Sequence, residues 1–332
     1  MKLGLMLGYW QAAPPPDLVE MAKFAEDLGW DSVWTAEAYG SDVVSPLCWI
    51  GANTSRIKLG TGLMQISART PASAAMTAAS IDHLSGGRLI LGLGVSGPQV
   101  VEGWYGRPFP KPLARTREYV EIIRKILARD APVESGGPHY PMPYPGGTKL
   151  GKPLKLTVHP LRNEIPIYLG AEGPKNVALA AEIADGWLPI FYSPYRNDAY
   201  EQALANVKPG FEVACPVTVI VSEDVSDALR FVKLSLSFYI GGMGAASKNF
   251  HLDVVSRMGF EGEAAKVQEL FLSGRRDEAV DAVPDALADE ISLVGPPARI
   301  RERLAAWHES PVTTLLVGSR DRDTLRLLSD LV

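Results

Sequence analysis

The sequence predicts an α/β protein built as a (β/α)8 TIM barrel with insertion segments. Short apolar runs alternate with longer amphipathic runs along the 332 residues, a pattern typical of repeated βα units with parallel strands. Eight strand-like runs, each followed by a helix, favour a closed barrel over a doubly wound sheet. The rhythm breaks at about 131–162, which is rich in Pro, Gly and Tyr, and at about 240–290, which is mainly helical. We expect a single barrel domain over residues 1–332 that carries these two insertions.

The first expected strand is LGLMLG at 3–8, because an uninterrupted apolar run is typical of a buried parallel strand. The first expected helix, DLVEMAKFAEDLG at 17–29, has apolar residues at helical spacing and a Gly where a helix often ends. The other strands are expected at 31–37, 56–65, 87–95, 164–170, 185–189, 211–222 and 313–318. The other helices are expected at 44–54, 73–87, 113–129, 174–184, 194–207, 224–239 and 321–331.

Composition favours a small-molecule partner. Lys and Arg number 33 against 38 Asp and Glu, and the net charge of −5 carries no basic run that would indicate nucleic-acid or membrane binding. Cys48 and Cys215 lie far apart in apolar surroundings, so we expect free thiols in a reducing compartment. Neither a cleavable leader nor a long apolar span is visible, so a cytoplasmic protein is expected.

Glycine gathers at three predicted strand ends, on the side where a barrel carries its functional groups. GTGLMQ at 60–65 indicates a bulge or a close ligand contact, and the alternative is that its glycines only relieve crowding in the barrel. GLGVSG at 92–97 follows the next strand. YLGAEGPKN at 168–176 is a tight turn before a helix, and the free N–H groups at that helix start make it a candidate phosphate site.

The segment 92–97 also matches the GxGxxG pattern of dinucleotide-binding folds. Three features argue against that interpretation: the segment lies in the fourth βα unit, Pro98 stands where the helix should run, and no strand ending in Asp or Glu follows about 20 residues later. A Rossmann-type nucleotide site is therefore not expected.

Aromatic residues follow four of the predicted strands, and in a barrel these positions converge on one opening. They are Tyr9, Trp10, Tyr39, Trp104, Tyr105, Phe191 and Tyr192. The chain has no GxSxG elbow, Walker loop or HExxH motif, and its five His residues show no metal-like spacing. An aromatic opening with an anion site and no nucleophile indicates that a bound cofactor supplies the chemistry.

Five blocks resemble the luciferase-like superfamily of flavin and deazaflavin oxidoreductases: LGLMLG, SVWTAE, LGTGLM, SIDHLSGGRLILGLGVSG and IPIYLGAEGPKNVALAAEIADGW. The last block is similar to the branch that includes methylene-tetrahydromethanopterin reductase and uses coenzyme F420, an 8-hydroxy-5-deazaflavin. The resemblance implies an F420-dependent oxidoreductase that transfers a hydride between deazaflavin C5 and an organic substrate, acting on CH–OH, CH–NH or C=C groups.

The resemblance also implies roles for individual residues. The Gly62–Leu63 bond would be a cis peptide behind the deazaflavin ring, Glu37 would exchange a proton near its reacting face, and Lys175 would face the phosphate. The implied cofactor contacts are Gly62, Leu63, Met64, Gln65, Val95, Ser96, Gly97, Gly170, Ala171, Glu172, Gly173, Pro174, Lys175 and Asn176. The expected substrate contacts are Tyr9, Trp10, Trp104, Phe191 and Tyr192, and no metal is expected.

Two departures from the sugar-phosphate dehydrogenase branch stand out. That branch has a His after the strand-two acid, where this chain has Ala38, and a second carboxylate where this chain has Pro98 and Gln99. Two alternatives stay open: an FMN-dependent luciferase-like monooxygenase, and a flavin or hydrophobic-ligand binding protein without catalysis. A homodimer is expected through the apolar helices 44–54 and 73–84. The stretch 131–162 is expected to be an ordered excursion or a lid, with a disordered linker as the alternative.

Overall fold

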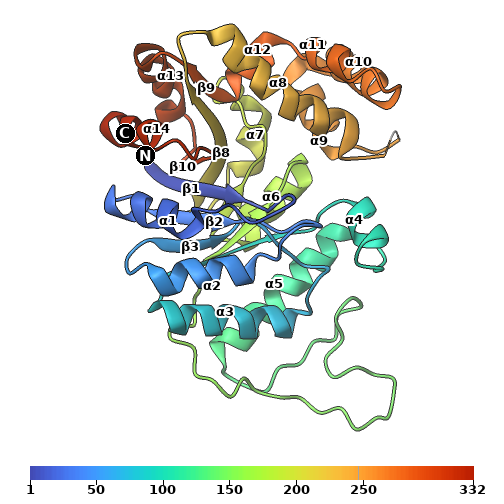
Figure 1. Cartoon of the computed structure of the whole chain (residues 1–332). Coiled ribbons are helices and arrows are strands. Elements are labelled where there is room, and N and C mark those ends of the chain that lie inside the picture. Colours follow the sequence, from blue (N-terminus) through green and yellow to red (C-terminus); the bar gives the residue numbers. More distant parts are fainter. Residues whose placement is uncertain (246) are drawn as a thin grey trace.

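The computed structural model describes residues 1–245 and 247–332 and contains a closed barrel of eight parallel strands (Figure 1). The barrel strands are β1 (Lys2–Gly8), β2 (Ser32–Thr35), β3 (Lys58–Thr61), β5 (Leu89–Gly94), β6 (Ile167–Gly170), β7 (Gly186–Leu188), β8 (Glu212–Val221) and β10 (Thr314–Val317). Strand β10 closes the ring because it pairs with both β1 and β8. The predicted TIM barrel is confirmed, and each predicted strand corresponds to one strand of the ring.

Helices connect the strands and cover the outside of the barrel (Figure 1). They are α1 (Leu18–Asp27), α2 (Val44–Asn53), α3 (Pro71–Ser85), α5 (Pro112–Ala128), α6 (Pro174–Ile183), α7 (Asp198–Leu204), α13 (Pro297–Glu309) and α14 (Arg322–Leu331). None of the described helices has the length and apolar content that crossing a bilayer requires.

The barrel interior is filled by side chains, as expected for an eight-stranded ring. Its buried members are Trp34, Ile90, Tyr168, Leu188, Ala214 and Leu316. Trp34 needs the glycine at Gly60, since a Cβ there would collide with the indole ring. The interior is therefore a packed core, and any ligand has to bind at an end of the barrel.

A bend separates β3 from the two-residue strand β4 (Met64–Gln65), where a single strand was predicted over 56–65. Leu59 pairs with Leu89, but Met64 pairs with Leu93, so the β3–β4 side holds one more residue than β5 over this interval. This extra residue is a β-bulge, which is one of the alternatives predicted for GTGLMQ. The Thr61 hydroxyl bridges the bend by donating to the Gly92 carbonyl at 2.8 Å.

The stretch 240–290 is mainly helical, as predicted. After α8 (Val225–Gly242) come α9 (Phe250–Val255), the π-helix η1 (Ser256–Phe260), α10 (Glu261–Leu272), α11 (Arg276–Asp281) and α12 (Asp285–Glu290). These helices bury an apolar cluster of their own. The four-residue strand β9 (Ser292–Gly295) was not predicted; it pairs with the last residues of β8, outside the closed ring.

A short helix, α4 (Pro98–Gly103), begins at Pro98, the residue predicted to oppose a helix. Proline fits the first position of a helix because its missing N–H has no partner there anyway. The prediction that Pro98 stands where no helix can run was therefore wrong. The barrel topology nevertheless excludes a Rossmann domain.

The insertion 131–162 lies along the outside of α3 and α5, at the bottom of Figure 1. Glu118 of α5 accepts hydrogen bonds from the backbone amides of His139 and Tyr140, at 3.0 and 2.6 Å. Arg162 pairs with the fully buried Asp82 of α3. These contacts hold residues 139–140 and the end of the insertion at Arg162 against the helical layer, so the structure gives no support to its expected role as a lid.

Candidate active site

The carboxyl ends of the parallel strands form one end of the barrel, which we call the barrel mouth. At this mouth β3, β5 and β6 meet around Leu63, because a Cβ at either Gly94 or Gly170 would collide with the Leu63 side chain. The Gly62–Leu63 peptide bond is cis, as the resemblance implied. Three glycine-rich segments that are far apart in the sequence therefore come together at one place.

The segment 95–97 continues the rim of the mouth from β5. Val95, Ser96 and Gly97 are all partly exposed, and Ser96 has a φ of 57°. This left-handed conformation turns the chain before α4 begins at Pro98. The segment thus presents accessible backbone next to the Gly62–Leu63 bend.

The turn Gly170–Asn176 leads from β6 into α6. The amides of Asn176 and Val177 donate to the Gly173 carbonyl, at 2.8 and 2.9 Å, whereas no backbone acceptor within the described residues takes the amides of Gly173 and Lys175. A Cβ on Gly173 would meet nothing within 4 Å. This helix start therefore offers free N–H donors beside open space, which is what an anion needs. The Lys175 side chain is exposed.

Glu37 lies just past β2, and its side chain is only 5% exposed. The carboxylate accepts hydrogen bonds from Arg69, at 2.7 and 2.9 Å, and from the Gln65 amide at 3.0 Å. Burial alone would lower the pKa of Arg69, but the hydrogen bond and charge of Glu37 outweigh burial and raise it. This ion pair ties β2 to the bend at β4. A role of Glu37 in proton transfer stays a prediction.

Two of the five expected substrate residues lie together near the mouth. Burial raises the pKa of Tyr239, and the neighbouring Tyr9 raises it further. The Phe191 ring lies 5.2 Å from the Tyr239 ring. Phe191 has a φ of 52°, a left-handed backbone conformation. Its side chain packs on Tyr239, whereas that of the next residue, Tyr192, packs on Trp307.

The other three expected substrate residues lie elsewhere. Tyr192 is 1% exposed and packs among Trp187, Tyr200 and Trp307 in the outer core. Trp10 lines a groove between α1 and α2. Trp104 is 64% exposed at the end of α4. Met64, an expected cofactor contact, is fully buried, so only its backbone is available.

Three residues near the mouth were not predicted: Arg69, which pairs with Glu37; Tyr239 from α8; and His251 from α9. Tyr105, one of the aromatic residues expected at the opening, contacts Ala38. The Tyr105 hydroxyl donates to the Ala38 carbonyl at 3.3 Å. Tyr239 and His251 stack edge to face with ring centroids 4.9 Å apart. The Arg69–Glu37 contact and the His251–Glu172 contact each join distant segments. No local pattern in the sequence predicts them.

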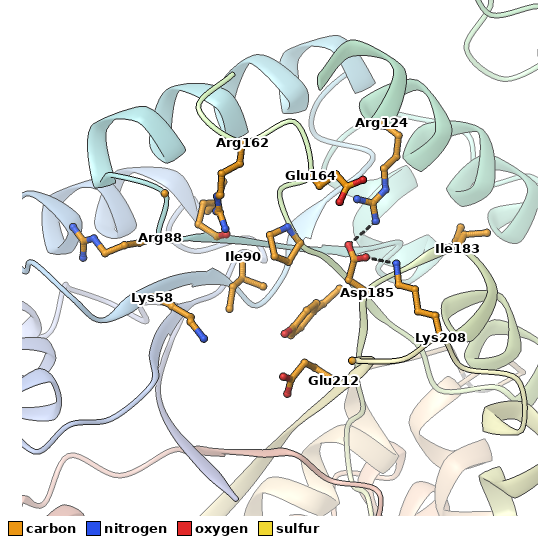
Figure 2. Close-up of a pocket in the computed structure, with 15 residues that line it drawn as sticks. Lys58, Arg88, Ile90, Arg124, Arg162, Glu164, Ile183, Asp185, Lys208 and Glu212 are labelled. Carbon is orange, nitrogen blue, oxygen red and sulfur yellow. Dashed lines mark hydrogen bonds and ion pairs between the residues drawn. The ribbon is translucent and has the colours of Figure 1, made fainter. Parts of the chain in front are cut away.

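A cavity of about 530 Å³ lies at the opposite end of the barrel, at the amino ends of the strands (Figure 2). Asp185 there pairs with Arg124, at 2.5 Å, and with Lys208. Burial would raise the pKa of Asp185, but the Ile167 amide and these two cations outweigh burial and lower it. Because these charged groups are paired with one another, and barrel enzymes carry their chemistry at the other end, we assign this cavity to barrel stability.

The family model for luciferase-like monooxygenases matches residues 1–314. The chain belongs to this family. Among curated luciferase-like relatives, a Mycobacterium tuberculosis protein named as a coenzyme F420-dependent oxidoreductase, Rv3520c, is 52% identical, with 100% of this chain and 99% of the relative covered. The 5,10-methylenetetrahydromethanopterin reductase of Methanolobus tindarius is 30% identical, with 92% and 91% covered.

Solved structures show the same luciferase-like barrel. The coenzyme F420-dependent tetrahydromethanopterin reductase from Methanopyrus kandleri matches with a TM-score of 0.79 at 24% identity, and the match covers 100% of this chain and 98% of that one. At this identity the match supports the fold, and the family assignment rests on the sequence matches.

Proposed function

We propose that this luciferase-like protein is a coenzyme F420-dependent oxidoreductase that transfers a hydride between deazaflavin C5 and an organic substrate at the barrel mouth. The observation that carries the proposal is the meeting of three segments there: the Gly62–Leu63 bend, the rim 95–97 and the start of α6. The M. tuberculosis relative, 52% identical over the whole chain, supports F420 as the coenzyme.

The residues at the mouth fit a flat ring with an anionic tail. Gly62 and Leu63 are partly exposed and present flat backbone, while Gly94 and Gly170 hold the Leu63 side chain between two strand ends. The free amides of Gly173 and Lys175 would take the phosphate. Val95, Ser96 and Gly97 would line the chain that joins ring and phosphate.

When bound, the deazaflavin supplies two-electron hydride chemistry. The protein then has to position the substrate and exclude water. Tyr9, Phe191 and Tyr239 provide an apolar wall for the substrate on the side of the helical insertion. The Glu37–Arg69 pair holds the β4 bend from the other side and keeps the backbone behind the ring in place.

Paired titrations of the cofactor-free protein with F420 and with FMN, followed by fluorescence, test the proposal. We expect F420 to bind at least about 100-fold more tightly, a difference of about 2.7 kcal/mol. A Lys175→Ala variant should bind F420 about 3-fold more weakly, since the phosphate would keep the backbone amides.

Two results would contradict the proposal. Preferential binding of FMN would favour the alternative of an FMN-dependent monooxygenase, with oxygen consumption as the next assay. Tight F420 binding without turnover of any donor or acceptor would favour a non-catalytic binding protein.

A homodimer belongs to the same proposal. Trp49 of α2 is 65% exposed and Met76 of α3 is 57% exposed, on the two helices expected to form the interface. Light scattering of the purified protein tests this: a dimer mass is expected, and a monomer mass at all concentrations would contradict it.

A further inference from the structure

His251 and Glu172 form a polar pair at the mouth that the proposed function does not yet use. His251 belongs to α9 of the helical insertion, and Glu172 belongs to the turn between β6 and α6. The Nδ1 atom of His251 lies 3.2 Å from the Glu172 Oε2 atom. Both atoms are buried, and neither forms a hydrogen bond with any group among the described residues, so their contact with each other is the polar contact that each one has. The two groups therefore depend on each other.

The pair has a defined orientation. Arg257 donates to the Glu172 carbonyl at 3.0 Å and holds the backbone of the turn. The Asn249 side chain accepts a hydrogen bond from the His251 backbone amide at 3.0 Å and fixes the start of α9. The other ring nitrogen of His251, Nε2, forms no hydrogen bond within the described residues and is not among the buried unpaired atoms, unlike Nδ1. Nε2 is thus the nitrogen left for a ligand.

The surroundings of the pair are aromatic. The His251 ring packs edge to face against Tyr239, at 4.9 Å between centroids, and against Phe191, at 5.9 Å. The titratable and charged groups beside this cluster are Glu172 from the β6 turn, Tyr9 and Tyr39 from the β1 and β2 ends, Tyr239 from α8 and Arg257 from η1. A substrate that reaches Nε2 therefore meets an apolar, aromatic wall around one polar group.

Acid–base chemistry at the mouth needs such a group. Ala38 stands where the sugar-phosphate branch has its His, and the Glu37 carboxylate is occupied by Arg69 and the Gln65 amide. In a His–carboxylate pair the carboxylate fixes the tautomer and orients the ring, so that the far nitrogen can accept a proton.

Resting on the proposed function, we infer that His251 is the proton-transfer residue, that Glu172 positions it, and that the substrate is an alcohol with an apolar or aromatic body, or the corresponding ketone. In the oxidative direction the carbinol C–H bond breaks and its hydride passes to oxidised F420. The O–H bond breaks as the C=O bond forms, and the proton passes to Nε2 of His251. In the reverse reaction, the ketone receives the hydride from reduced F420 and the proton from Nε2 of His251.

The test uses the full-length protein loaded with F420 and two probe alcohols, 1-phenylethanol and cyclohexanol. We expect oxidation of at least one of them, and we expect H251N to lower kcat by about 100-fold or more, the usual contribution of general acid–base catalysis. The affinity for F420 should change by less than about 2-fold, because His251 is not among the residues assigned to the coenzyme. His308→Asn, on the exposed face of α13, is the matched control and should behave as wild type.

A second readout needs neither F420 nor substrate. Nitrogen-15 NMR of the cofactor-free protein should show His251 with its proton on Nδ1, facing Glu172. E172Q should remove this tautomer preference and lower kcat, measured at saturating F420, by about 10-fold. If Glu172 had only a structural role, any change in the His251 tautomer or in kcat caused by E172Q would come with a lower melting temperature.

The outcomes separate the two proposals. If wild type binds F420 but oxidises neither alcohol, or if H251N keeps wild-type kcat, this inference is overturned and the proposed function stands. Loss of F420 binding in H251N would make His251 a coenzyme ligand, which also overturns it. If wild type does not bind F420, the proposed function fails and this inference fails with it.

Discussion

Arg69 donates two hydrogen bonds to the Glu37 carboxylate, at 2.7 and 2.9 Å, at the point where β2 and the β4 bend meet. The two side chains are 18% and 5% exposed, so the pair is largely removed from water. A pair of this kind is costly to break from one side, since the remaining charge stays buried without compensation.

Arg69→Met is therefore expected to lower the free energy of unfolding by about 3–5 kcal/mol. The double variant Glu37→Gln with Arg69→Met should be less destabilised than Arg69→Met alone, because no unpaired charge remains. Urea denaturation of the three proteins measures this. Equal destabilisation of the single and double variants would show that the ion pair does not anchor the bend.

The glycine at Gly170 should matter for coenzyme binding. A Cβ there would displace the Leu63 side chain and with it the bend at the mouth. Gly170→Ala is expected to weaken F420 binding by about 10-fold, or about 1.4 kcal/mol. Gly136→Ala, where a Cβ meets nothing within 4 Å and φ is not positive, is the control and should bind as wild type. Unchanged affinity in Gly170→Ala would place the ring elsewhere.

The sequence predicted the barrel strands well because parallel strands buried on both faces are written as apolar runs, as in LGLMLG at 3–8. Glycine was equally informative, since Gly62, Gly94 and Gly170 lie where backbone and side chains crowd at the mouth. Strand β9 was missed because it directly follows the helical stretch 240–290 and pairs with the end of β8, outside the ring.

Side-chain direction was harder to predict. Phe191 and Tyr192 are adjacent in sequence, but Phe191 faces the mouth cluster and Tyr192 is buried in the outer core. His251 could not be assigned, because its partner Glu172 lies in a different βα unit and the two meet only through tertiary packing. Such contacts depend on how the helical insertion docks, which no periodicity reports.

The position of the insertion 131–162 predicts its protease sensitivity. Glu118→Ala removes the acceptor of the His139 and Tyr140 amides, so tryptic cleavage after the exposed Lys149 should accelerate by about 10-fold through local opening.

Glu121→Ala, on the same helix but paired only with Lys125, is the control for this experiment and should be cleaved as wild type. Addition of F420 should leave all cleavage rates unchanged, since the insertion lies along α3 and α5. Protection by F420 would instead restore the role of a lid.

Stability should depend on pH through Asp185 at the amino end of the barrel. Burial would raise the pKa of Asp185, but hydrogen bonds from the Ile167 amide, Lys208 and Arg124 outweigh burial. The pKa is therefore lowered in the folded protein from its ordinary value of 3.8. A lowered carboxyl pKa stabilises the fold at all pH values above 3.8, and this stabilisation is lost as the pH falls through the folded pKa.

Asp185→Asn should therefore lower the free energy of unfolding at neutral pH by about 1–3 kcal/mol. The difference from wild type should stay constant from pH 7 down to 3.8 and shrink as the pH falls from 3.8 to about 2, because wild-type Asp185 becomes protonated as well. Urea denaturation across this range measures both effects. Glu182→Gln, which removes only the exposed Arg117 pair, should show no measurable change. A difference between Asp185→Asn and wild type that stays constant from pH 3.8 down to about 2 would mean that hydrogen-bond geometry, and not the Asp185 charge, stabilises this end of the barrel.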